Sequence, residues 1–232
     1  MTAIAASIDQ VRSRIATAAR EAGRDPAEVQ LLLAVKRVEA ARIREAFDAG
    51  ATLIGQNRAQ ELVATEPDLV DVPHETHVIG HLQSNKVNQV MRWANCVQSV
   101  DSSKLAERLD RAAAARERDL DVFIQVNTSG EETKSGVPPE QAGELAAVVG
   151  SLPHLHLRGL MTIGANSPDP GEVRASYTAL AHARDAVVSS ADPGTGEARE
   201  LSMGMSGDLE IAIAAGATMV RVGTGVFGSR NT

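Results

Sequence analysis

Aromatic residues are scarce in this chain of 232 residues. Phe, Trp and Tyr together supply 2% of the sequence, which is too little for the stacking platforms on which single-stranded nucleic acids bind. Basic residues are outnumbered as well, because the net charge is −7, whereas nucleic acids and anionic membranes call for a basic face. We therefore expect neither nucleic acid nor a membrane as a partner.

Cysteine is represented by Cys96 alone, so no internal disulfide can form and a reducing compartment is expected. The apolar setting of this residue favours a buried small side chain over a nucleophile. Apolar runs long enough to span a membrane are missing, as are the basic flank and the continuous apolar core of a signal peptide. These features predict a cytoplasmic protein.

Short aliphatic runs alternate with Ala-rich amphipathic segments along the chain. The runs are mostly apolar throughout, which is typical of parallel strands covered on both faces. We expect strands at residues 30–35, 52–55, 76–80, 96–100, 122–126, 155–162, 200–203 and 218–222. Helix patterns lie between them at 39–48, 57–64, 84–93, 103–118, 139–149, 171–189 and 209–214. An extra helix at 4–21 precedes the first strand.

This alternation predicts an α/β fold, a single (β/α)8 barrel of the TIM type with an extra N-terminal helix. The length and a hydrophobic content of 43% fit one such domain over residues 1–232. Function in these barrels gathers at the carboxyl ends of the strands. The residues that follow each strand are therefore the candidates for a site.

Two turns near the C-terminus combine Gly with small hydroxyl residues, each after an expected strand. Residues 202–208 have the sequence SMGMSGD, and residues 219–225 have the sequence MVRVGTG. Gly allows backbone N–H groups to approach a ligand, and Ser206 and Thr224 add hydroxyl donors. A helix expected to begin near Gly207 points its positive end at the same place. Together the turns predict a phosphate site, where barrel enzymes usually hold one.

Lys36 follows the apolar run 31–35 at the carboxyl end of the first expected strand. Its amine would emerge from an apolar wall, where partial desolvation favours the neutral, nucleophilic form. An amine that faces a phosphate site suits a phosphorylated aldehyde. Two such ligands are pyridoxal 5′-phosphate (PLP) and the phosphorylated sugar of a Schiff-base aldolase.

Arg221 helps to choose between these ligands, because it precedes Gly223 by two residues on the last expected strand. A guanidinium that faced a pyridine nitrogen would leave that nitrogen unprotonated and weaken the ring as an electron sink. This arrangement favours holding PLP over carbanion chemistry. A phosphate contact or an ion pair is the alternative role for this arginine.

Five further motifs stand out along the chain. They are GHLQSNK at 80–86, QVN at 125–127, ETKSG at 132–136, RGLMT at 158–162, and LSMGMS at 201–206 followed by RVG at 221–223. These motifs resemble those of a known family, the pyridoxal phosphate homeostasis proteins (YggS/PROSC family). The resemblance covers nearly the whole chain. It implies a PLP-binding barrel similar to the N-terminal domain of bacterial alanine racemase. It also implies a monomer that buffers PLP and delivers it for vitamin B6 homeostasis, with PLP-dependent apo-enzymes as partners and no established turnover.

The resemblance also implies roles for single residues. It makes Lys36 the Schiff-base lysine, Asn57 a contact near the cofactor ring, and Arg221 the partner of the pyridine nitrogen. Ser206 would bind the phosphate together with Gly223 and Thr224. With two further candidates, the expected cofactor-binding residues are Lys36, Asn57, His81, Met205, Ser206, Arg221, Gly223 and Thr224.

Weaker signals come from four other positions. His81, at the end of the third expected strand, either contacts the ligand or holds its loop. Lys134, after the fifth strand, is expected to be an exposed loop lysine rather than a second aldehyde acceptor. His154 and His156 flank a strand start without a Cys or carboxylate at suitable spacing, so we expect no metal site.

Three functions are weighed: a PLP carrier without turnover, a PLP-dependent amino-acid racemase and a Schiff-base aldolase. Racemisation needs a second proton-transfer group on the opposite face of the ring. Tyr177 is the only tyrosine, and it falls within a helix pattern, far from any strand end. An aldolase would want an acid/base partner beside its lysine. We therefore expect a carrier, with no catalytic residue.

Overall fold

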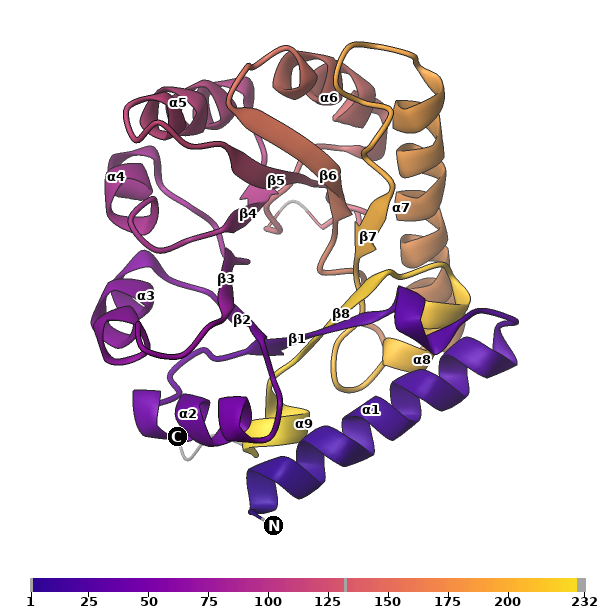
Figure 1. Ribbon diagram of the computed structural model, residues 1–232. Coiled ribbons are helices and arrows are strands. Elements are labelled where there is room, and N and C mark those ends of the chain that lie inside the picture. The colour runs from indigo at the N-terminus through magenta and orange to yellow at the C-terminus, as the bar shows by residue number, and fades with distance from the viewer. Residues whose placement is uncertain (1, 132, 229–232) are drawn as a thin grey trace.

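The strands of the computed structural model close into a barrel (Figure 1). The structure describes residues 2–131 and 133–228. The eight strands lie in chain order, and every neighbouring pair is parallel, including the closing pair of β1 and β8. They are β1 (Gln30–Ala34), β2 (Leu53–Gln56), β3 (Glu75–Val78), β4 (Cys96–Val100), β5 (Leu120–Gln125), β6 (Leu155–Met161), β7 (Glu200–Ser202) and β8 (Met219–Val222). The predicted barrel is thus confirmed.

Helices cover the outside of the barrel. They are α1 (Ala3–Glu21), α2 (Ala40–Asp48), α3 (Ala59–Thr65), α4 (Val87–Val90), α5 (Ser103–Ala114), α6 (Ala142–Gly150), α7 (Pro170–Ser189), α8 (Leu209–Ala214) and α9 (Thr224–Phe227). Single 3-10 turns are η1 (Pro26–Glu28), η2 (Glu66–Asp68), η3 (Ser84–Lys86) and η4 (Pro139–Gln141). The extra helix α1 packs against α2, α8 and α9. It therefore covers the side of the barrel where the short α9 follows β8 (Figure 1).

Some helices are shorter than their sequence patterns. α5 ends at Ala114 rather than at residue 118, because Glu117 takes a left-handed φ of 51° that stops the helix. The pattern at 84–93 splits into η3 and α4. α9 lies outside the expected elements, since a helix of four residues is too short to show a periodic pattern.

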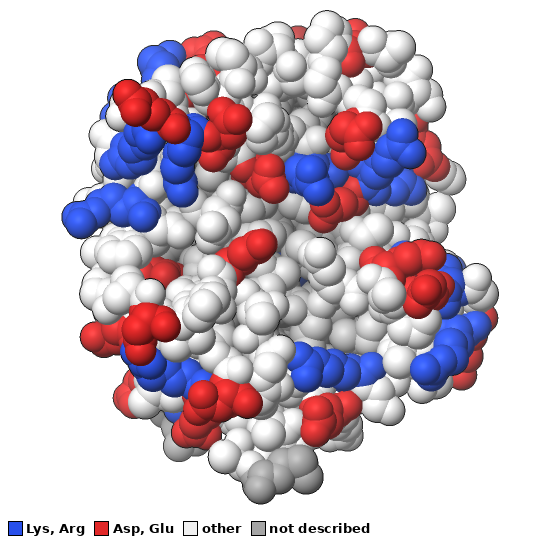
Figure 2. Space-filling model, in the orientation of Figure 1, with Lys and Arg blue, Asp and Glu red and all other residues white. Residues whose placement is uncertain are grey.

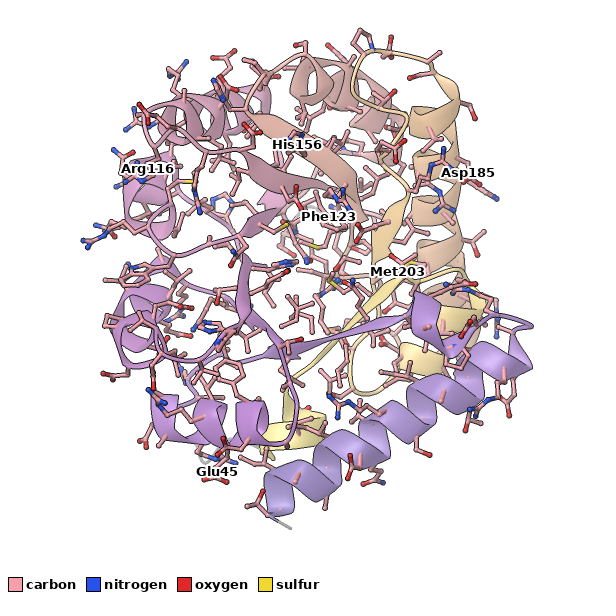
Figure 3. The ribbon with its side chains drawn as sticks, in the orientation of Figure 1. Glu45, Arg116, Phe123, His156, Asp185 and Met203 are labelled. Atoms are coloured by element: carbon pink, nitrogen blue, oxygen red, sulfur yellow. The ribbon has the colours of Figure 1, made fainter. Side chains whose placement is uncertain are left out.

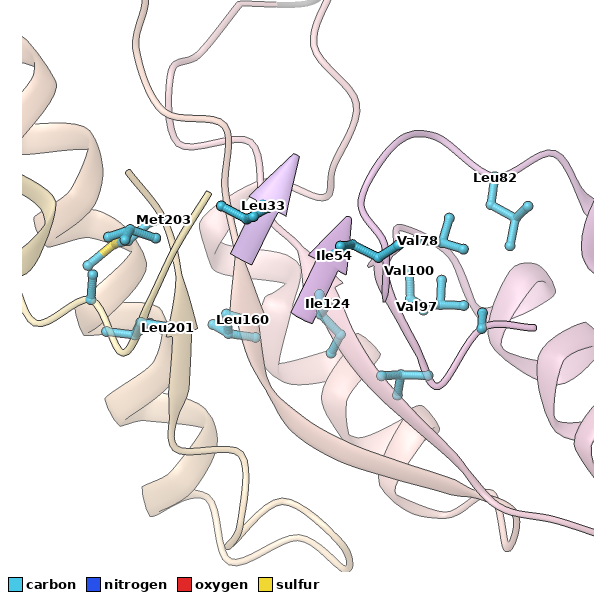
Figure 4. Close-up of a cluster of buried hydrophobic side chains, with 14 of the residues drawn as sticks. Leu33, Ile54, Val78, Leu82, Val97, Val100, Ile124, Leu160, Leu201 and Met203 are labelled. Carbon is cyan, nitrogen blue, oxygen red and sulfur yellow. The ribbon is translucent and has the colours of Figure 1, made fainter. Parts of the chain in front are cut away.

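The main hydrophobic core lies between the strands and the surrounding helices. Figure 4 shows part of it, and the labelled side chains are all buried. They are Leu33, Ile54, Val78, Leu82, Val97, Val100, Ile124, Leu160, Leu201 and Met203. α1 contributes Ile4, Ile8, Val11 and Ile15, which are spaced three or four residues apart and so share one face. This core fixes the helices around the barrel.

The inside of the barrel holds two smaller apolar clusters, separate from the main core. Their members are Leu32, Ile79 and Met219 in one, and Cys96, Phe123 and Met161 in the other. Figure 3 shows Phe123 within the ring of strands, whereas Glu45, Arg116 and Asp185 lie at the outer edge of the molecule. Cys96 is buried, as its apolar setting predicted, and burial raises the pKa of its thiol.

Acidic and basic side chains are interspersed on the face of the molecule that Figure 2 shows, with no extended basic field there. At the amino ends of the strands, Arg158 lies 3.2 Å from a carboxylate oxygen of Glu200 and 3.8 Å from one of Asp121. Among the described helices, none combines the length and the apolar character that crossing a bilayer requires.

Candidate functional site

The turns after β7 and β8 meet at the carboxyl end of the barrel. Ser206 Oγ accepts a hydrogen bond from the backbone N–H of Gly225 at 3.2 Å and one from the hydroxyl of Thr224 at 3.3 Å. A Cβ atom at Gly225 would lie 3.0 Å from a methyl carbon of Val222 and 3.3 Å from Ser206 Oγ, so glycine suits this close approach. The two predicted hydroxyl donors are therefore brought together with a backbone amide. Their binding of phosphate stays a prediction.

Arg14 of α1 holds the Ser206 turn from outside the barrel. Its Nη1 donates to the Ser206 carbonyl at 3.1 Å, while Nε and Nη2 donate to the Glu210 carboxylate at 2.7 and 2.9 Å. This pairing lowers the pKa of Glu210 and raises that of Arg14. The sequence analysis missed Arg14, because the amphipathic pattern of α1 does not say which loop its polar face contacts.

Tyr177 of α7 holds the same turn through Asp208. Its hydroxyl donates to Asp208 Oδ2 at 2.9 Å, and Asp208 Oδ1 accepts the backbone N–H of Met205 at 2.6 Å. The tyrosine lies in α7, as expected, and is fully buried. The expectation that it lies far from any strand end was wrong for its hydroxyl, because the long side chain reaches the loop after β7. Burial, followed by the Asp208 charge, raises the pKa of Tyr177.

Lys36 lies on the turn after β1 and is half-buried. The next residue, Arg37, has a left-handed φ of 58°, and its backbone N–H donates to Glu61 Oε2 at 3.1 Å. Such a φ is uncommon outside glycine and occurs often at functional sites. A Cβ atom at Gly223 would lie 2.9 Å from the carbonyl oxygen of Ala34, so the ends of β1 and β8 are in close contact. This contact places the Lys36 turn beside the turn that bears Thr224.

Asn57 and His81 follow β2 and β3 at the same rim. The backbone of Asn57 packs closely on Gly80, since a Cβ atom there would lie 2.1 Å from the Asn57 carbonyl oxygen. His81 is exposed, and its Nδ1 lies 3.3 Å from Asp101 Oδ2 at the end of β4. The contact with Asp101 agrees with the loop-holding role that the sequence left open for His81.

Arg221 points into the barrel, where it is 6% exposed. Its Nη1 donates to Ser202 Oγ at 2.9 Å, and its Nη2 donates to the Thr162 carbonyl at 2.7 Å. Burial lowers the pKa of Arg221 to about 10, so the guanidinium stays protonated at neutral pH. The arginine therefore supplies a fixed positive charge just below Gly223.

Met205 and Lys134 line a hollow of about 530 Å³ next to the Ser206 turn. Met205 is 39% exposed there. The Lys134 side chain is only 18% exposed, and its amine donates to Glu131 at 2.6 Å and to the Gly164 carbonyl at 2.9 Å. The expectation of an exposed loop lysine is thus wrong, because the loop folds its amine onto two acceptors. Glu132, part of the ETKSG motif, lies outside the described residues.

A carboxylate does accompany His154 and His156, contrary to the expectation from spacing. Asp119 Oδ1 lies 3.3 Å from His154 Nδ1, and Asp119 Oδ2 lies 3.1 Å from His156 Nε2. The aspartate precedes β5, and the pairing of β5 with β6 brings it to the histidines. Within the part of the chain that the structure describes, no group of three or more His, Cys, Asp or Glu side chains is arranged to hold a metal ion.

The carboxyl rim therefore combines an amine, hydroxyl and amide donors, and a buried guanidinium on neighbouring strands. Known proteins match this chain along its length. The family model of the alanine racemase N-terminal domain matches residues 6–231. The pyridoxal phosphate homeostasis protein of Pseudomonas aeruginosa is 45% identical over 232 residues, which cover 100% of this chain and 97% of that protein. The chain belongs to the pyridoxal phosphate homeostasis protein family.

Solved structures of other proteins are also similar to this member of the pyridoxal phosphate homeostasis protein family. A protein of Bifidobacterium adolescentis is 42% identical, with a TM-score of 0.94 over 97% of this chain and 94% of that one. PipY of Synechococcus elongatus PCC7942, solved with PLP bound, is 35% identical, with a TM-score of 0.83 over 97% and 100% of the two chains. An alanine racemase of Clostridium difficile 630 is 12% identical, with a TM-score of 0.70 over 95% and 56%, and shares the fold alone.

Proposed function

We propose that this protein binds PLP, buffers it and delivers it to PLP-dependent apo-enzymes, and so serves vitamin B6 homeostasis. Family membership supports the proposal, as does the PLP bound in PipY. The observation that carries it is the meeting of three donors, the hydroxyls of Ser206 and Thr224 and the N–H of Gly225, beside the turn that bears Lys36.

The chemistry of these residues fits PLP. Uncharged hydroxyl and amide donors from Ser206, Thr224 and Gly225 suit the oxygens of a phosphate. Lys36 would offer an amine to the aldehyde carbon, and Arg221 would serve as the cationic donor to the ring nitrogen. PLP, when bound, supplies a reactive aldehyde and an electron-withdrawing ring.

The remaining candidates have supporting roles in the proposal. Asn57 would lie near the ring, and Gly223 allows β8 to approach the end of β1. Met205 belongs to the phosphate turn, where Asp208 accepts its backbone N–H. His81 holds the loop after β3 through Asp101, and its exposed ring would be free to contact the ligand.

We further propose that the protein does not turn over amino acids. A racemase needs a second proton carrier, and the hydroxyl of Tyr177 is engaged with Asp208. Burial raises the pKa of Tyr177, so this phenol is a poor base at neutral pH. The names of the curated relatives also favour homeostasis over racemisation or aldol chemistry.

We also propose that the protein is a single-domain monomer over residues 1–232, that it acts in the cytoplasm, and that it binds neither nucleic acid nor a membrane. Its acidic net charge of −7 and its one cysteine, which is buried, support this setting. The proposed partners are PLP and the enzymes that accept it.

Borohydride reduction tests the proposal on the purified, PLP-loaded protein. Reduction makes the link between a lysine and PLP permanent, and peptide mass mapping then locates the tag. We expect the tag on Lys36, with loss of the PLP absorbance band in Lys36→Ala at unchanged far-UV circular dichroism. A tag on Lys86 or Lys134 that spares Lys36 would contradict the assignment, and absence of any tag or absorbance band would contradict PLP binding.

A further inference from the structure

A chain of hydrogen bonds crosses the interior of the barrel beneath the rim. Arg221 Nη1 donates to Ser202 Oγ at 2.9 Å, and Ser202 Oγ donates to Gln98 Oε1 at 2.7 Å. Gln98 Nε2 in turn lies 2.8 Å from His77 Nδ1. The four side chains come from β8, β7, β4 and β3, and none is more than 6% exposed. A polar chain this deeply buried is costly unless every member is satisfied.

The orientation of the Gln98 amide fixes the direction of these hydrogen bonds. Met219 Sδ lies 3.0 Å from Gln98 Nε2, and a thioether can only accept. Reversing the Gln98 amide would place its oxygen against this sulfur, so the NH2 group stays on the side of His77 and Met219. Burial lowers the pKa of His77 to about 4, so its ring is neutral at physiological pH and Nδ1 can accept.

This direction determines what Arg221 contacts. Because the Gln98 oxygen faces Ser202, the single hydroxyl proton of the serine is used there and its lone pair faces the guanidinium. The Thr162 carbonyl accepts from Nη2 at 2.7 Å and holds the guanidinium at a second point. Two of the five N–H groups of an arginine are thus engaged, and among the described residues the other three donate to no protein acceptor.

We propose that Ser202 and Gln98 are positioning residues that aim the guanidinium of Arg221 at the ring nitrogen of PLP and so set the preference of the site for a pyridine ring. The inference rests on the proposed function. It concerns the selection of the ring, whereas the proposed function requires only that PLP binds.

Two ligands that differ only at the ring nitrogen test the proposal. PLP and 1-deazapyridoxal 5′-phosphate, in which a C–H group replaces the ring nitrogen, are titrated separately into the full-length protein by fluorescence or absorbance. We expect the wild type to bind PLP about tenfold or more tightly than the deaza analogue, the effect of one hydrogen bond from a charged donor. Arg221→Met should bring this ratio of dissociation constants close to one.

Ser202→Ala and Gln98→Met should lower the same ratio at least several-fold, because each breaks the chain without touching the ligand. Gln98→Met keeps the volume of the side chain, so the two variants perturb packing differently. Ser99→Ala is the matched control, since Ser99 is a fully buried serine whose Oγ has no hydrogen-bond partner among the described residues. We expect it to keep the wild-type ratio.

A wild-type ratio retained in both Ser202→Ala and Gln98→Met would overturn the positioning role. Equal binding of the two ligands by the wild type would overturn it as well, and would leave PLP binding intact. Failure of the wild type to bind either ligand would instead refute the proposed function.

Discussion

At the scale of single residues, the hydroxyl of Ser206 is the most direct test of phosphate recognition. We expect Ser206→Ala to weaken PLP binding by about 1–3 kcal/mol, because one hydrogen bond to a charged ligand is lost. Pyridoxal, which lacks the phosphate, should bind more weakly from the start and respond little to the change. Equilibrium titration of both ligands measures this, and equal losses for the two would show that Ser206 does not contact phosphate.

A buried ion pair gives a residue-scale prediction about stability. His74 Nε2 lies 3.2 Å from Glu66 Oε2, and Thr76 donates to the other oxygen at 2.6 Å. The hydrogen bond with Glu66 raises the pKa of His74 above its usual value. A raised pKa in the folded state means that the pair stabilises the fold fully below the unfolded pKa, about 6.5. This contribution is lost as the pH rises through the folded pKa.

Glu66→Gln removes the charge of this pair, keeps one acceptor oxygen for Thr76, and replaces the oxygen that faces His74 with an NH2 group. The difference in unfolding free energy between wild type and variant should be larger at pH 5.5 than at pH 8.5. Urea unfolding at both pH values measures it. A difference that does not change with pH would refute the linkage to His74.

At the scale of elements, α1 is coupled to the phosphate turn through Arg14. We expect Arg14→Met to weaken PLP binding roughly two- to tenfold, the range of one modest hydrogen bond, because the Ser206 carbonyl loses its donor. The melting temperature should change little, since the Arg14 and Glu210 side chains are 34% and 47% exposed. Arg20→Met, an exposed arginine on the same helix, is the control. If PLP affinity and the dissociation rate are unchanged in Arg14→Met, α1 does not support the site through Arg14.

The elements themselves could be predicted from the sequence because their signals are local. Each strand is a short apolar run, and the barrel topology then brings the ends of β1, β7 and β8 to one rim. Lys36, Ser206 and Thr224 can therefore be expected near one another from the sequence alone. The short α9 gave no periodic signal, and the early end of α5 depends on the backbone angle of Glu117.

Contacts between distant side chains could not be predicted in this way. Arg14 and Ser206 are 192 residues apart in the sequence, and Gln98 and Ser202 are 104 apart. Their meeting depends on helix rotation and on which side chains face the barrel interior, neither of which a single sequence states. The same holds for the hydroxyl of Tyr177, whose helix was predicted but whose reach to Asp208 was not.

At the scale of the whole molecule, the proposed carrier role predicts binding without turnover. The PLP-loaded protein is incubated with L-alanine in deuterium oxide, and Cα exchange and chirality are followed by NMR and chiral chromatography. We expect rates no higher than those of free PLP, because Tyr177 is not available as a second base. Exchange well above that level that is lost in Lys36→Ala would refute the carrier role and support a PLP-dependent racemase.

Barrel closure has a consequence for biosynthesis. Within the described residues, β1 pairs with β2 and β8, so the strand that precedes Lys36 gains its second neighbour when β8 has left the ribosome. The proposed site is likewise divided between the turn after β1 and the turns after β7 and β8. A nascent polypeptide therefore exposes Lys36 long before the phosphate-binding turns are synthesised, and we expect PLP capture to begin only after β8 and the turn that follows it have emerged, as a slow, long-range step of folding.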